Sequence, residues 1–228
     1  MQNFTRRLLT ACAFSGVLAS TAAIADNHPT IRAMSGAMPV DHLPAGKSAL
    51  IVIDFQNEYF RGRMPIPDGG AALAKTRELI TFADRHKIPV YHVQHVAPAG
   101  SAVFAIDGET VKFHKDMQPR AKDVVLQKNT VSVFASTDLD QQLKKAGIQT
   151  LIISGLMTHA CVDGAARDAA PLGYNVIVAS DASATRAITR VNGVSIDKDS
   201  LHQAALAEVE DTFGDVLSTE QIVQLPVR

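Results

Sequence analysis

Tryptophan is absent from this 228-residue chain, and aromatic residues make up only 5% of it. So few rings predict no stacking platform for nucleic acid. An excess of one charge is also lacking, because 22 Lys and Arg residues face 23 Asp and Glu residues for a net charge of −1. A near-neutral chain gives no electrostatic reason to expect nucleic acid or an anionic membrane as a partner. Repeats and low-complexity tracts are missing as well.

Cysteine is scarce, and one of the two cysteines lies in an N-terminal stretch with its own pattern. Arg6 and Arg7 precede an apolar stretch that ends with Ala-Ile-Ala at Ala25. This pattern predicts a signal peptide over residues 1–25, and therefore a periplasmic or secreted protein that is not bound to a membrane once the signal is removed. The stretch is short and rich in Ala, Ser and Thr, which argues against a membrane span. Lipidation at Cys12 is the less favoured alternative, because little apolar sequence precedes it.

Removal of the signal leaves Cys161 as the sole thiol of the mature chain. A lone thiol in an oxidising compartment cannot form an internal disulfide. Free cysteines are more often small buried hydrophobes than reactive groups, so composition alone favours a packing role for Cys161. Its local context has to decide between packing and chemistry.

Most of the chain alternates apolar runs with amphipathic helical patterns. Residues 26–46 hold three prolines and no sustained period, which predicts an extended N-terminal arm ahead of a domain over 47–228. This alternation predicts a three-layer α/β/α sandwich around a mainly parallel, Rossmann-like sheet of five to six strands. Strands are predicted over 48–55, 88–96, 123–128, 149–155 and 174–182, and helices over 69–87, 136–147, 160–172 and 199–213.

Three reactive residues fall at the carboxyl ends of predicted strands, where functional groups gather in such sheets. Asp54 follows the first strand, Lys128 ends the third, and Cys161 comes shortly after the fourth. Cys161 would occupy the first turn of a helix, whose dipole is expected to lower the pKa of the thiol. Taken singly, Asp54 could be a cap or an ion-pair partner and Lys128 a solvated charge. Together they indicate a site.

The segments around these residues resemble a known family. "ALIVIDFQNEY" carries the acid, "VLQKNTVSVF" the lysine and "GLMTHACV" the cysteine, and "VASDASAT" extends the likeness to most of 47–216. In order and spacing they resemble the isochorismatase-like cysteine hydrolases, which include nicotinamidases, ureidoacrylate amidohydrolases and N-carbamoyl amidases. The resemblance implies the isochorismatase-like hydrolase fold and a homo-oligomer, either a dimer or a tetramer.

The resemblance also implies roles for individual residues. Cys161 matches the nucleophile, Asp54 the general base and Lys128 the lysine of a Cys-Asp-Lys triad. A cis peptide between Leu156 and Met157 would turn the Met157 N–H toward the Cys161 N–H, and the two would form an oxyanion hole. The implied activity is hydrolysis of a C–N bond in a small carboxamide or N-carbamoyl compound through a thioester.

Four further residues are expected to line the substrate pocket, namely Gln56, Tyr59, His95 and Phe134. Core packing is the alternative for Tyr59 and Phe134, and Gln56 could instead orient the acid. The long segment 97–120 is expected to lie over the site as a lid.

No metal and no other cofactor is expected. Nicotinamidases carry a metal site built around an Asp-x-His cluster after the acid, whereas residues 54–70 contain no histidine. His92 and His95 are three apart on a predicted strand and point to opposite faces, which is unsuitable for chelation. Nicotinamide is therefore a less favoured substrate.

Two other functions stay open from the sequence. One is vinyl-ether hydrolysis of isochorismate, which ranks lower because relatives with that chemistry generally lack the cysteine and because an exported protein would be far from that metabolite. The other is a non-catalytic binding or redox module that uses the thiol alone, and this module would not depend on Asp54 or Lys128.

Overall fold

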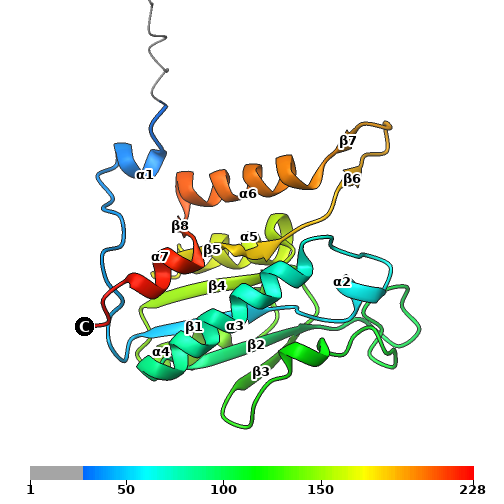
Figure 1. Cartoon of the computed structure of the whole chain (residues 1–228), viewed down its shortest axis with the longest axis horizontal. Coiled ribbons are helices and arrows are strands. Elements are labelled where there is room, and N and C mark those ends of the chain that lie inside the picture. The colour runs from blue at the N-terminus through cyan, green and yellow to red at the C-terminus, as the bar shows by residue number, and fades with distance from the viewer. Residues whose placement is uncertain (1–27) are drawn as a thin grey trace, which may run out of the picture.

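The computed structural model describes residues 28–228, which form a six-stranded sheet between two layers of helices (Figure 1). The strand order is β3-β2-β1-β4-β5-β8, and every neighbouring pair is parallel. The predicted α/β/α sandwich is thus confirmed, whereas the predicted signal peptide and Cys12 lie outside the described residues. The strands are β1 (Ser48–Ile53), β2 (Val90–His95), β3 (Val124–Lys128), β4 (Thr150–Leu156), β5 (Asn175–Ala184) and β8 (Asp215–Leu217).

Each face of the sheet has its own apolar core, because alternate side chains of a strand point to opposite faces. Leu50 and Val52 pack on the face covered by α3 (Gly69–His86) and α7 (Thr219–Gln224). The alternating residues of the same strand pack on the other face. That face is covered by α4 (Leu139–Lys145), α5 (Asp163–Ala169) and α6 (Lys198–Thr212).

The N-terminal arm differs from the predicted extended segment. It contains the one-turn helix α1 (Ile31–Met34), which is capped by the Thr30 hydroxyl accepting a hydrogen bond from the Ala33 N–H. Farther along, Leu43 is fully buried and pairs with Val227 in an isolated bridge. The arm is therefore packed onto the domain.

The elements that the sequence did not predict are all short, and they contain too few residues to show a hydrophobic period. They include β8 and α7 at the C-terminus and a hairpin, β6 (Ile188–Thr189) with β7 (Ser195–Ile196), that projects from the body of the molecule (Figure 1). The others are α2 (Glu58–Arg61), the 3₁₀ turns η1 (Lys115–Met117) and η2 (Val133–Ala135), and the π-helical turn η3 (Thr158–Val162). Within residues 28–228, no helix is both long and apolar enough to cross a membrane.

Candidate active site

The carboxyl ends of β1, β3 and β4 bring three reactive side chains together. The Lys128 Nζ lies 2.8 Å from the Asp54 Oδ2 and 3.3 Å from the Cys161 Sγ. Lys128 thus bridges a carboxylate and a thiol that are 107 positions apart in the sequence. The prediction that these three side chains share one site is confirmed by these distances.

Two unusual backbone positions produce this approach. Asp54 has a left-handed φ of 56°, a conformation that costs a non-glycine residue about 1 kcal/mol or more and that is often found at functional sites. Gly155 in β4 has a φ of 145°, and a Cβ there would lie 2.3 Å from the Ile53 carbonyl oxygen. Because Gly155 has no side chain, β4 can pass close to the end of β1, and the turn with Cys161 follows directly.

Asp54 is placed where its carboxylate can act as a base. It is completely buried, and burial raises its pKa against the opposing attraction of Lys128. Within residues 28–228, neither carboxylate oxygen has a hydrogen-bond partner of good geometry. The ion pair with Lys128 is therefore the main interaction that offsets the cost of burying this charge. A buried carboxylate with a raised pKa and unused lone pairs is a strong candidate for a general base.

Cys161 is a thiol rather than a thiolate at rest. Burial raises its pKa to about 12, with a further increase from the Asp54 charge, and Lys128 only partly opposes this. The prediction of a helix-lowered thiol pKa is therefore wrong. Cys161 lies in the π-helical turn η3 and only 6% of its surface is exposed, so desolvation of the thiolate outweighs the dipole.

Lys128 remains a cation although it is buried. Burial lowers its pKa, but attraction to Asp54 and Cys161 outweighs burial, and the pKa is raised overall. Its ammonium also contacts the His95 Nδ1 at 2.9 Å and the Thr130 carbonyl oxygen at 3.2 Å. His95 therefore belongs to the immediate surroundings of the triad, whereas His92 is buried beside Asp123, on the other side of the strand.

Gln56 is a structural residue rather than a pocket residue, which corrects that prediction, whereas the pocket role of Tyr59 stays a prediction. Gln56 is fully buried: its Nε2 donates to the His95 and Val111 carbonyl oxygens at 2.8 and 2.6 Å, and its Oε1 accepts from the His95 N–H at 2.8 Å. Tyr59 is buried with its ring edge-on to Phe104. Apolar patterning cannot separate such core positions from a pocket wall.

Phe134 packs against another aromatic ring. Its ring packs against that of Tyr174, with centroids 6.1 Å apart, and Tyr174 directly precedes β5 at the amino end of the sheet. This contact supports a packing role for Phe134, and its place in the substrate pocket stays a prediction.

Two residues near the triad were missed by the sequence analysis. Phe104, from segment 97–120, packs with its ring tilted against that of His95, with centroids 4.9 Å apart, so this segment does cover the site. Arg186 comes two residues after β5. Burial raises the pKa of Tyr59 and lowers that of His159, and the positive charge of Arg186 is near enough to oppose the first shift and add to the second. Its position just beyond the carboxyl end of a predicted strand could have identified Arg186 from the sequence.

The Arg186 side chain has no acidic partner within the part of the chain that the structure describes. Its Nη1 donates to the Ala187 carbonyl oxygen at 3.1 Å, while its Nε is buried without a hydrogen-bond partner. Guanidinium groups are suited to binding carboxylates and other planar anions. Arg186 can therefore receive an acidic group from outside the chain.

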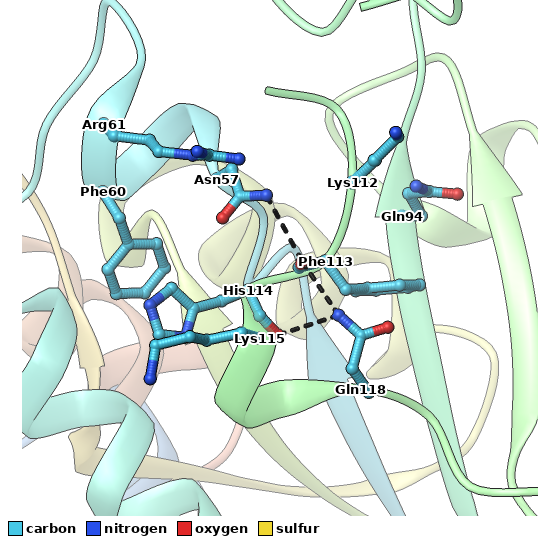
Figure 2. A pocket seen from close by; sticks show the side chains of 9 residues that line it. All are labelled: Asn57, Phe60, Arg61, Gln94, Lys112, Phe113, His114, Lys115 and Gln118. Carbon is cyan, nitrogen blue, oxygen red and sulfur yellow. Dashed lines mark hydrogen bonds between the residues drawn. The ribbon is translucent and has the colours of Figure 1, made fainter. Parts of the chain in front are cut away.

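A sizeable cavity lies apart from the triad. It has a volume of about 660 Å³ and is built mainly by α2 and by the end of segment 97–120 (Figure 2). Figure 2 shows the Gln118 amide donating to two backbone carbonyl oxygens inside it. None of Asp54, Lys128 and Cys161 lines it. The lining residues are Asn57, Phe60, Arg61, Gln94, Lys112, Phe113, His114, Lys115 and Gln118.

The remaining site predictions have different outcomes. The peptide between Leu156 and Met157 is cis, as the resemblance implied. The oxyanion-hole role of the Met157 and Cys161 N–H groups stays a prediction. Over residues 28–228, no three His, Cys, Asp or Glu side chains are grouped to hold a metal ion, so no metal-binding residues can be named there.

Comparison with known proteins identifies the family. The Isochorismatase domain matches residues 48–221, which is most of the chain and includes all three triad residues. This chain belongs to the isochorismatase family. The family match agrees with the fold and with the resemblance of the segments around Asp54, Lys128 and Cys161. The protein is an isochorismatase-family hydrolase.

Individual relatives of this isochorismatase-family hydrolase cover most of its length. The secreted isochorismatase effector Isc1 of Verticillium dahliae is 32% identical over 193 residues, which is 85% of this chain and 98% of that protein. Nicotinamidase 3 of Arabidopsis thaliana is 27% identical over 188 residues, which is 77% of this chain and 86% of that protein. The crystal structure of an isochorismatase from Pseudomonas putida has a TM-score of 0.79 and 28% identity, covering 86% of this chain and 100% of that one.

Proposed function

We propose that this isochorismatase-family hydrolase is an exported cysteine amidohydrolase that cleaves a C–N bond of a small carboxamide or N-carbamoyl compound. The observation that carries this proposal is the buried ammonium of Lys128, held 2.8 Å from a carboxylate and 3.3 Å from a thiol. A cysteine that served only for packing would need neither charge, since burying two ions costs several kcal/mol each before they are paired.

The three side chains can complete acylation. Asp54 takes the thiol proton as the Cys161 sulfur attacks the amide carbon, and the Met157 and Cys161 N–H groups stabilise the resulting oxyanion. The C–N bond then breaks, the proton passes from Asp54 to the departing nitrogen, and ammonia or an amine leaves. A thioester between Cys161 and the acyl group remains.

Water completes the cycle. Asp54, again ionised, removes a proton from a water molecule that attacks the thioester, and the carbonyl oxygen carries the charge as before. The C–S bond breaks, the sulfur regains a proton from Asp54, and the acid product leaves. Lys128 keeps its proton throughout and stabilises whichever partner is anionic.

Arg186 favours substrates that carry an acidic group next to the scissile amide. An unpaired guanidinium at the carboxyl edge can bind a carboxylate with two parallel hydrogen bonds, which neutral substrates cannot offer. N-carbamoyl acids combine the two features, and the name of Nicotinamidase 3 supports amide hydrolysis in a related chain.

Hydrolysis of isochorismate is the second candidate, and one observation favours it. The Verticillium dahliae relative is named as a secreted isochorismatase effector, so export does not by itself argue against that substrate. The two candidates differ in their need for a nucleophile. Amide hydrolysis through a thioester requires the Cys161 sulfur, whereas addition of water to a vinyl ether does not.

The test is a substrate panel with the purified protein. N-carbamoyl amino acids, their neutral esters, primary amides and nicotinamide are scored for ammonia release, and isochorismate for loss of the vinyl ether. We expect release from a carbamoyl or amide compound, abolished by Cys161→Ala and retained by the matched control Ser154→Ala, whose buried hydroxyl has no partner among the described residues. Arg186→Gln should raise KM for the acids more than for their esters.

Other results would reject the proposal. If only isochorismate reacts, or if folded Cys161→Ala retains the rate of ammonia release, the thioester mechanism is wrong. Equal changes in KM for acids and esters in Arg186→Gln would remove the assignment of an acidic substituent.

A further inference from the structure

His95 and Lys128 are partners across two parallel strands. They are paired in the register of β2 and β3, and the His95 Nδ1 lies 2.9 Å from the Lys128 Nζ. An ammonium has three protons and no lone pair, so Nδ1 must accept this hydrogen bond. The imidazole proton is therefore on Nε2, and the ring is neutral.

Lys128 has more acceptors around it than it has protons. The nearest are the Asp54 Oδ2 at 2.8 Å and the His95 Nδ1 at 2.9 Å, followed by the Thr130 carbonyl oxygen at 3.2 Å and the Cys161 Sγ at 3.3 Å. Three of them accept hydrogen bonds from the ammonium, namely the His95 Nδ1, the Thr130 carbonyl oxygen and the Cys161 Sγ, whereas Asp54 pairs with it as an ion. These three hydrogen bonds use the three protons, so His95 helps to fix the rotation of the ammonium.

His95 is itself held on two sides. Gln56 bonds both its backbone N–H and its backbone carbonyl oxygen, each at 2.8 Å. The Phe104 ring packs against the imidazole at 4.9 Å. A side chain that only lined a pocket would not need this support.

We infer that His95 is a positioning residue, whose neutral imidazole orients the Lys128 ammonium between Asp54 and Cys161. This inference rests on the proposed function of the triad. The charged group that contacts the imidazole is Lys128 from β3, while segment 97–120 presents the apolar Phe104. Burial and the Lys128 charge lower the pKa of His95 to about 4, which agrees with a neutral ring.

Two substitutions separate positioning from packing. Asn places an acceptor oxygen near the position of Nδ1, so His95→Asn should keep the lysine oriented, whereas His95→Leu keeps the volume and removes the acceptor. We expect His95→Leu to lower kcat by roughly 10- to 100-fold with little change in KM, and His95→Asn to restore most of it. His92→Asn, on the opposite face of β2, is the control for loss of a strand histidine and should leave kcat unchanged.

A second readout does not depend on the substrate. Alkylation of Cys161 by iodoacetamide, followed by mass spectrometry of its peptide across pH, should be slower and shifted to higher pH in His95→Leu, but not in His95→Asn or His92→Asn. Equal behaviour of the two His95 variants, or an unchanged alkylation profile in His95→Leu, would overturn the inference. A protein that cleaves no amide yet shows the expected alkylation pattern would refute the proposed function and retain the role of His95.

Discussion

At the scale of single residues, a few backbone positions decide whether the reactive groups meet. Asp54 adopts a left-handed conformation at the end of β1, and Gly155 lets β4 pass within van der Waals range of that end. Neither position is distinguished by hydrophobicity. The chemistry of the site therefore depends on backbone geometry that a pattern of apolar residues does not encode.

Gly155→Ala is expected to destabilise the protein by about 3 kcal/mol, because the new Cβ would lie 2.3 Å from the Ile53 carbonyl oxygen and would also be held at a positive φ. Urea unfolding followed by circular dichroism measures this loss. Gly100→Ala is the matched control, since Gly100 has a φ of 75° but open space around it, and it should cost only about 1 kcal/mol. Equal losses would show that the close approach of β4 to β1 is unimportant.

The pH dependence of kcat/KM should reflect the raised pKa of the buried Asp54. Only the ionised carboxylate can accept the thiol proton, so kcat/KM is full above the pKa of Asp54 and falls as the pH drops through it. Since burial raises this pKa, we expect the acid limb to lie above the usual aspartate value of about 3.9. A pH–rate profile measures the limb, with unfolding followed in parallel as the control. A limb at or below that value, in folded protein, would contradict the role of Asp54.

At the scale of elements, segment 97–120 is an anchored cover rather than a loose loop. It buries Phe104, Val111 and Met117, and Gln56 bonds the Val111 carbonyl oxygen beneath it. Phe104 contacts both Tyr59 and His95. With Cys161 only 6% exposed, access to the sulfur depends on how this segment and the neighbouring side chains move.

Phe104→Ala is expected to cost about 3 kcal/mol of stability and to speed alkylation of Cys161, because the ring that supports the cover is removed. Phe134→Ala removes a ring that packs on Tyr174 rather than on His95, so it should lower stability without changing the alkylation rate. Denaturant unfolding and timed labelling measure the two effects. A faster alkylation in Phe134→Ala as well would mean that general loosening, and not the cover, controls access.

The long elements were predictable, and the short ones were not. The five longer strands and the helices α3 and α6 follow from apolar runs and helical periods, with bounds shifted by at most two residues. The predicted helix over 160–172 instead begins as the π-helical turn η3, in which Cys161 is buried. β8 and α7 carry too few residues for a periodic pattern to emerge.

At the scale of the whole molecule, the parallel sheet gathers side chains from one edge into a single site. The strand order places the ends of β1 and β4 side by side and the end of β3 on the far side of β2, so residues far apart in sequence meet at one edge of the sheet. Export is a further proposal at this scale, since it depends on residues 1–25, outside the described part of the chain.

We expect the mature protein to begin after Ala25. N-terminal sequencing of protein recovered from an exporting bacterial host should find Asp26 first, because the Ala-Ile-Ala pattern fits signal cleavage. Replacement of Arg6 and Arg7 by Glu should retain the chain inside the cell, and replacement of exposed Lys115 by Glu is the charge control. A lipidated Cys12, or an uncleaved chain outside the cell, would contradict this prediction.

The sequence by itself determined the fold class, the order of the long elements and the placement of Asp54, Lys128 and Cys161 at strand ends, because hydrophobic periodicity and strand direction are local and regular properties. Only the tertiary structure decided the charge state of Cys161, the burial of Gln56 and Tyr59, the position of Phe134 and the nearness of His95, Phe104 and Arg186. These depend on how completely each side chain is removed from water and on which distant side chains come to face it. No local pattern in the chain encodes either quantity.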